Sequence, residues 1–110
     1  MIRKTFKSEI QLVKDEVLLL GSMVEHAIIG SVEALKKRDL KASEKLIAED
    51  KEINKKRFAI ENQLMILIAT QQPMAHDLRL LASTMEIISE LERMGDYAKG
   101  IANINLRMGE

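Results

Sequence analysis

The segment KTFKSEIQLVKDEVLLLGSMVEHAIIGSVEALKKR, residues 4–38, decides the fold of this 110-residue chain. Its apolar and small side chains recur at alternating steps of four and three residues, the spacing of one side of an α-helix. This row comprises Phe6, Ile10, Val13, Val17, Leu20, Val24, Ala27, Ser31 and Ala34. The pattern predicts one helix from about Lys4 to Arg38, on the order of 50 Å long at 1.5 Å per residue.

Two further helices are predicted after two short breaks. Asp39 is a suitable N-cap for a second helix over residues 40–69. Pro73 is favoured at the first helical position, so a third helix is expected over residues 73–108. Short connections make consecutive helices antiparallel neighbours. We therefore predict an all-α fold, an up-down-up antiparallel three-helix bundle that forms a single domain over residues 1–110.

Composition excludes several classes of function. Seventeen Lys and Arg residues balance seventeen Asp and Glu residues, so the chain is not expected to bind nucleic acid. Cysteine is absent, which excludes disulfides, thiolate metal sites and a cysteine nucleophile. The chain has no Gly-rich phosphate loop and no nucleophile elbow, so we do not expect an enzyme. Its uninterrupted apolar runs are far shorter than the roughly 20 residues of a membrane span, which favours a cytoplasmic protein.

Several carboxylates are expected at one level of the bundle. Counting from the turns places Asp50 on the second helix and Glu92 on the third at similar heights. Asp96 follows Glu92 by four residues and therefore shares its helix face. The same count adds Glu25 as a further candidate ligand. It also places Arg57 near Glu86, as an ion pair between the second and third helices.

Clustered carboxylates repel one another unless water, a basic side chain or a cation offsets their charge. Hard cations take oxygen ligands, and facing helices of a bundle can supply them. The spacing alone leaves three interpretations open: a metal site, a salt-bridge network or a solvated face. A di-metal redox or storage protein is disfavoured, because it would need Glu-x-x-His pairs that this chain lacks.

Two motifs associated with the third helix are more specific than this spacing. They are QQPMAHDLR at residues 71–79 and LERMGDYA at residues 91–98. A further stretch, IAEDKEI at residues 47–53, lies on the second helix. Together they closely resemble the PhoU family of bacterial and archaeal phosphate-uptake regulators, over essentially the whole chain. The resemblance implies one three-helix PhoU repeat, half of the two-repeat architecture common in that family.

The resemblance also implies a metal site. The family's Glu/Asp-x-x-x-Asp motif, which is associated with bound iron or zinc, falls on Glu92 and Asp96. Asp50 matches another acidic position of the family. We therefore expect a divalent or trivalent ion here, with iron or zinc favoured and manganese or magnesium compatible.

Three residues of the first motif are expected to be structural. They are Pro73, Asp77 and Arg79. Asp77 suits the stabilisation of a helix N-terminus, and Arg79 is expected to form an ion pair near the turn.

By this resemblance, the chain is a non-enzymatic regulator of phosphate uptake and phosphate-starvation signalling. It would act as a metal-binding adaptor between a phosphate transporter ATPase and a sensor histidine kinase, associating with the membrane only peripherally. The alternatives are an accessory domain of another ion or phosphate transporter, or a purely structural helical module without metal. A single repeat would expose apolar surface that a second repeat covers, so a homo-oligomer is expected.

Overall fold

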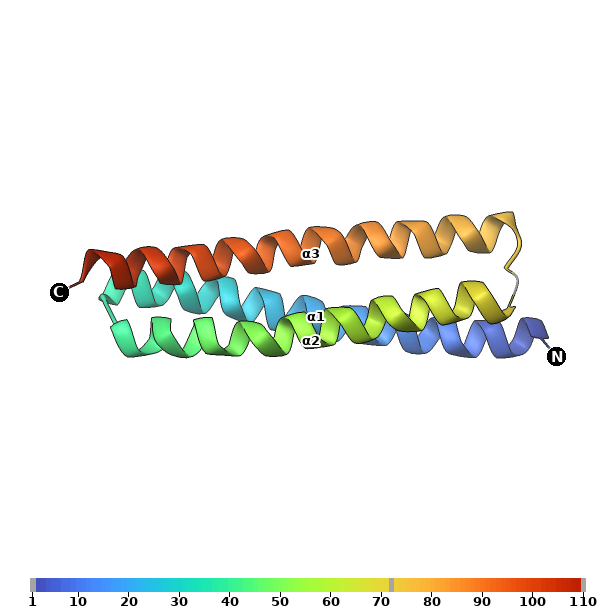
Figure 1. Ribbon diagram of the computed structural model, residues 1–110, viewed down its shortest axis with the longest axis horizontal. Coiled ribbons are helices and arrows are strands. Elements are labelled where there is room, and N and C mark those ends of the chain that lie inside the picture. Colours follow the sequence, from blue (N-terminus) through green and yellow to red (C-terminus); the bar gives the residue numbers. More distant parts are fainter. Residues whose placement is uncertain (1, 72, 110) are drawn as a thin grey trace.

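The computed structural model describes the backbone of residues 2–71 and 73–109, and the side chains of residues 6–71 and 73–109. Its helices are α1 (Ile2–Lys37), α2 (Leu40–Gln71) and α3 (Ala75–Met108). They lie side by side in a rod whose Cα extents are 60 × 17 × 17 Å (Figure 1). No residue in the described ranges forms a strand. The all-α, up-down-up three-helix bundle is thereby confirmed.

The helix boundaries differ from the expected ones by a few residues. α1 ends at Lys37, and α2 continues to Gln71 instead of ending near residue 69. Pro73 precedes α3 and is not its first residue, because Met74 has the extended backbone of an N-cap, with φ −77° and ψ 170°. Gln72, part of the predicted turn, lies outside the described residues.

The α1–α2 turn is closed by hydrogen bonds at both of its ends. Arg38 adopts the left-handed conformation with φ 55°. Its N–H donates to the Leu35 carbonyl at 3.2 Å, and the Asp39 N–H donates to the Ala34 carbonyl at 2.8 Å, the pattern of a Schellman motif. Asp39 Oδ1 then accepts the Ala42 N–H at 3.0 Å, which confirms Asp39 as the N-cap of α2.

We expect Asp39→Ala to lower the free energy of unfolding by about 1 kcal/mol, because the cap's hydrogen bond to α2 is lost. Asp39→Asn retains a side-chain oxygen at the same position and should lose much less. Urea unfolding followed by circular dichroism measures both variants. Equal losses in the two variants would show that the side-chain oxygen does not contribute.

The core lies along the axis between the three helices. The row predicted on α1 is buried throughout, except that Val17 is only partly buried. The largest fully buried apolar side chains come from all three helices: Leu20, Ile60, Leu64, Leu67, Leu81 and Ile88. Burying a side chain of this size contributes roughly 1.5–3 kcal/mol, so this row holds the rod together.

α1 is more apolar than its buried face requires. Its segment Phe6–Lys37 is long and apolar enough to cross a membrane by length and composition, although its uninterrupted apolar runs are short. Core helices of soluble proteins pass the same test, and α1 packs on both of the other helices. Even so, only 28% of its most apolar stretch is buried in the bundle.

A buried amide holds α3 to the α1–α2 turn. Asn105 is fully buried, and its Nδ2 lies 2.8 Å from Ser43 Oγ. The same Nδ2 lies 3.2 Å from the Ala34 carbonyl and 3.3 Å from the Asp39 carbonyl. In return, Arg38 Nη2 donates to the Asn105 carbonyl at 3.5 Å. The end of α1, the start of α2 and the last turns of α3 are therefore joined at one buried point.

Candidate functional site: a charged cluster between α2 and α3

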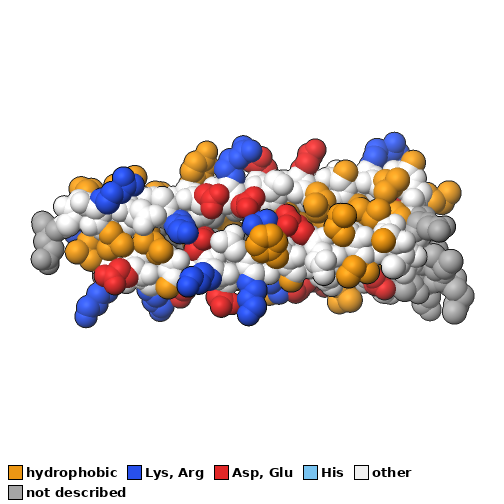
Figure 2. All heavy atoms as spheres, viewed as in Figure 1, with side chains coloured by type: hydrophobic (Ala, Val, Ile, Leu, Met, Phe, Trp, Pro, Cys, Tyr) orange, Lys and Arg blue, Asp and Glu red, His pale blue; other side chains and the backbone are white. Residues whose placement is uncertain are grey.

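Charged side chains gather over the middle of the groove between α2 and α3 (Figure 2). α2 contributes residues at successive steps of four, three and four, which lie along one helix face. α3 contributes two residues seven positions apart, again on one face. The α2/α3 charged cluster comprises Asp50, Asn54, Arg57, Glu61, Glu92 and Lys99.

Arg57 is the centre of this cluster. Its Nη2 lies 2.9 Å from Glu92 Oε2 on α3, and its Nη1 lies 3.2 Å from Glu61 Oε1 on α2. The guanidinium also lies over the Phe58 ring, 4.2 Å from its centroid. Only 12% of the Arg57 side chain is exposed, and its Nε has no acceptor among the described residues. Arg57 therefore neutralises Glu92 and ties the two helices together.

Asp50 is the most buried carboxylate of the cluster, with 6% of the residue exposed. Its Oδ2 accepts a hydrogen bond from Asn54 Nδ2 at 3.0 Å. The Lys99 ammonium lies 3.6 Å from the same oxygen. A buried charge is costly unless it is paired and hydrogen-bonded, and these two groups provide the pairing and the hydrogen bond.

The predicted pairing of Arg57 with Glu86 is wrong, because Arg57 contacts Glu92 instead. The residue count took the turn to be centred at Gln71, whereas α3 begins only at Ala75. The residues of the connection shift α3 along α2, so each α2 residue faces a later α3 residue than expected. Asp50 and Glu92 consequently contact two different basic side chains.

The structure separates some of the residues expected to bind metal. Glu92 and Asp96 share a face of α3, and Asp96 is exposed. Asp50 is buried beside Lys99. Glu25 lines a different groove, between α1 and α3.

Within the described part of the chain, no group of three or more His, Asp or Glu side chains is placed to hold one metal ion. The oxygen donors suit a hard cation, but two of the expected ligands already have basic partners. The residues as placed therefore do not make a complete site. To bind one ion together with Asp96, Glu92 would have to separate from Arg57 and Asp50 from Lys99, so metal binding stays a prediction.

The first motif surrounds the start of α3. Asp77 is buried, and its Oδ2 accepts the Met74 N–H at 3.3 Å, as in a capping box. Arg79 is exposed and forms no ion pair with a described residue, so the expected pair near the turn is not formed there.

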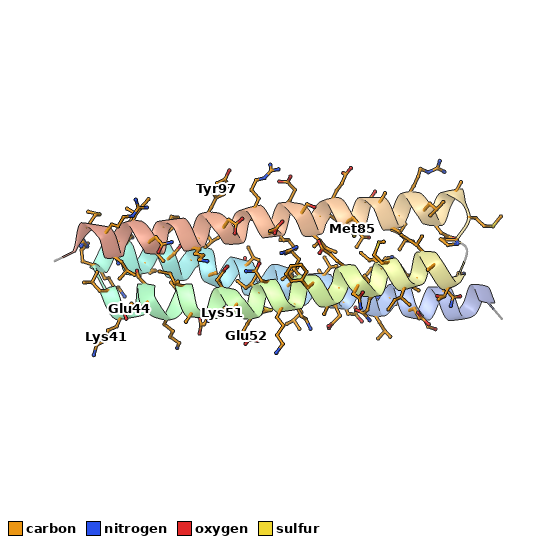
Figure 3. The ribbon with its side chains drawn as sticks, in the orientation of Figure 1. Lys41, Glu44, Lys51, Glu52, Met85 and Tyr97 are labelled. Carbon is orange, nitrogen blue, oxygen red and sulfur yellow. The ribbon has the colours of Figure 1, made fainter. Side chains whose placement is uncertain are left out.

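Farther along α3, Met85 points toward α2, whereas Tyr97 points away from both other helices (Figure 3).

The PhoU domain family matches residues 17–104, which include most of the bundle and the whole charged cluster. The chain belongs to the PhoU family. It is 41% identical over 109 residues to a phosphate-specific transport system accessory protein PhoU homolog of Clostridium acetobutylicum, covering 98% of this chain and 50% of that protein. Against the accessory protein PhoU of Escherichia coli the identity is 34% over 101 residues, covering 92% and 42% of the two chains. No solved structure matches the chain significantly.

The chain thus spans about half the length of the PhoU relatives it matches.

The second motif of this chain places Glu92 in the charged cluster and Gly95 close to α2. A Cβ atom built on Gly95 would meet Ile53 Cγ2 at 3.8 Å, an ordinary van der Waals contact between α3 and α2. Sequence reasoning missed Lys99 and Asn54 as partners of Asp50. Their signal was spacing: Lys99 follows Glu92 by seven residues, and Asn54 follows Asp50 by four.

Proposed function

We propose that this chain regulates phosphate uptake as part of a phosphate transport system. The observation that carries the proposal is its likeness to the Clostridium acetobutylicum PhoU homolog, which extends over 98% of the chain. That relative and the Escherichia coli protein are both accessory proteins of a phosphate-specific transport system. The chain spans about half of each of these two relatives, so a regulatory role for this chain is an inference from the likeness.

In finer detail, we propose a non-enzymatic adaptor in the cytoplasm that contacts a phosphate transporter ATPase and a sensor histidine kinase. A rod 60 Å long offers separate surfaces to two partners. The supporting features are the charged α2/α3 groove on one side and exposed apolar side chains on other sides. The adaptor would repress phosphate-starvation genes when phosphate is plentiful.

The metal belongs to this proposal as well. Iron or zinc, or alternatively manganese or magnesium, would bind through Glu92 and Asp96, with Asp50 as a further ligand. The supporting feature is the pair of carboxylates four residues apart on one face, of which Asp96 is exposed. Binding would require Glu92 to separate from Arg57, so the ion pair and the metal would compete for the same carboxylate.

A bacterial strain lacking its own PhoU protein and carrying a phosphate-starvation reporter tests the regulatory role. In high phosphate, expression of the chain should lower the reporter signal several-fold. The variant Asp96→Lys should lose this repression, because it reverses an exposed charge of the second motif. The matched variant Glu44→Lys reverses an exposed charge on α2 and should keep it.

Immunoblots measure the amounts of the wild-type chain and of both variants, so that reporter signals are compared at equal protein amounts. An unchanged reporter signal with abundant wild-type chain contradicts the regulatory role, and it favours the accessory domain of another transporter or a structural module. Full repression by Asp96→Lys contradicts the involvement of the second motif.

A further inference from the structure

A pocket of about 420 Å³ lies in the groove between α1 and α2. Its apolar wall comprises Met23 and Ala27 of α1 together with Leu46 and Ile53 of α2. These four side chains belong to the hydrophobic core or pack against it, so the bundle itself holds the wall in place. The volume lies within the range of roughly 300–1,000 Å³ that is typical of small-molecule sites.

Two contacts between the helices bound this pocket along the rod. On one side, the Lys56 ammonium of α2 pairs with the Glu16 carboxylate of α1. On the other side, Leu46 packs so closely on α1 that a Cβ atom built on Gly30 would stand 3.3 Å from Leu46 Cδ2. The α1 residues that line the pocket fall within positions 22–27, a rise of about 8 Å. A partner helix would have to run over both contacts, whereas a small molecule fits between them.

Two carboxylates line the pocket from α2. Glu49 is half-buried, and Glu52 is exposed and points away from α3 (Figure 3). Neither side chain forms an ion pair or a hydrogen bond with a described residue. His26 lines the pocket from α1, and no Lys or Arg is among the described residues that line it. The pocket therefore combines an apolar wall with negative charge that no group within it neutralises.

The lysines of α2 that are close in sequence to these carboxylates do not neutralise them. Lys56 pairs with Glu16 on α1. Lys45 and Lys55 are exposed, and neither forms an ion pair with a described residue. Asp50 differs in this respect, because it faces α3 and contacts Lys99. Adjacent positions of α2 thus carry one carboxylate that is paired and one that is left to a ligand.

We infer that the α1/α2 pocket binds a small organic amine, an ammonium group carried on a short apolar chain. Glu49 and Glu52 bind the ammonium group, because hydrogen bonds between charged partners are the stronger ones. The apolar wall takes the chain, which is removed from water on binding. A metal ion would leave this wall unused, and no three His, Asp or Glu side chains of the described chain are placed to hold one.

Hexylammonium is the probe that tests this inference, and heteronuclear NMR of the isotope-labelled chain is the measurement. The amide resonances of residues 22–27 and 46–53 should shift and reach saturation, with a Kd of about 1 mM or lower. Hexanoate has a similar apolar chain with the opposite charge, and methylammonium has the charge without the chain. Both should bind at least about ten-fold more weakly than hexylammonium.

Glu49→Gln removes a charge from the pocket and keeps the size of the side chain. It should raise the Kd of hexylammonium at least about five-fold, with unchanged helical circular dichroism. Glu44→Gln is the matched control, because Glu44 is also on α2 and does not line the pocket. This control should leave the Kd of hexylammonium as it is in the wild type.

Resonance shifts that do not saturate, or that arise mainly in α3, overturn the proposal. Equal Kd values for hexylammonium and hexanoate also overturn it, because the apolar wall alone would then account for binding. An unchanged Kd in Glu49→Gln does the same. The titration uses the isolated chain and no reporter strain, so the amine site and the regulatory role can fail separately.

Discussion

We expect Asn105→Ala to lower the free energy of unfolding by about 3 kcal/mol. The Asn105 side chain is fully buried, and its Nδ2 donates within the α1–α2 turn. Alanine leaves Ser43 Oγ without its partner in a place closed to water, whereas the Ala34 carbonyl keeps the Asp39 N–H as a donor. A buried group left unpaired costs about 1–3 kcal/mol, and the space vacated by the amide adds to the loss.

Asn103→Ala is the control for this experiment, because Asn103 lies on the same helix and is only partly buried. It should change the free energy of unfolding by less than about 0.5 kcal/mol. Urea unfolding followed by circular dichroism measures both variants at one protein concentration, so that association contributes equally. Similar values for the two variants would show that the buried amide contributes nothing particular to the turn.

Asn105 also shows why part of the core was not predictable. In the sequence, a step of four residues on the third helix leads from Ala102 to the apolar Leu106, but Leu106 is only partly buried and Asn105 is fully buried. A polar side chain is found in a protein core where neighbouring groups accept its hydrogen bonds. Its acceptors Ala34 and Ser43 are more than sixty residues away along the chain, so a search for apolar periodicity passes over it.

The helices themselves were predictable because the period of a helix is a local property of the sequence. The row from Phe6 to Ala34 needs no knowledge of the partner helices, and the structure buries almost all of it. The register between helices depends instead on how many residues a turn uses. The error in the partner of Arg57, from Glu86 to Glu92, amounts to about 9 Å along α3 at 1.5 Å per residue. Such a shift decides whether carboxylates meet one another or meet basic side chains.

The second large effect concerns the proposed metal. We expect free iron, zinc or manganese at about 100 times Kd to raise the wild-type free energy of unfolding by about 2.7 kcal/mol, if the ion binds only the folded chain. The double variant Glu92→Gln with Asp96→Asn should lose this gain. In chelator, the free energy of unfolding of the double variant should be close to that of the wild type. The relief of repulsion between the carboxylates of Glu92 and Asp96 offsets the loss of the ion pair between Glu92 and Arg57.

Thermal melts of both proteins, in chelator and in metal, measure the two differences. Metal content should be determined on protein purified without an affinity tag, so that the tag does not supply the ligands. If wild type and variant gain equal stability from metal, Glu92 and Asp96 are not the ligands. The α2/α3 charged cluster is then a salt-bridge network that joins two helices.

The variant Arg57→Gln distinguishes a metal-binding role of Glu92 from a purely structural one. It removes the guanidinium that would compete with a metal ion for Glu92 and leaves the carboxylates in place. Without metal, the variant should be less stable, since Glu61 and Glu92 lose their common partner and the Phe58 ring loses its cation. With metal, it should gain more stability than the wild type, because the ion no longer has to displace a guanidinium from Glu92. A salt-bridge network without a metal role predicts the first change and excludes the second. The deciding measurement is therefore the gain in the free energy of unfolding on adding metal, compared between Arg57→Gln and the wild type. A larger gain in the variant indicates that Glu92 is a metal ligand for which Arg57 competes, and an equal gain indicates a purely structural cluster.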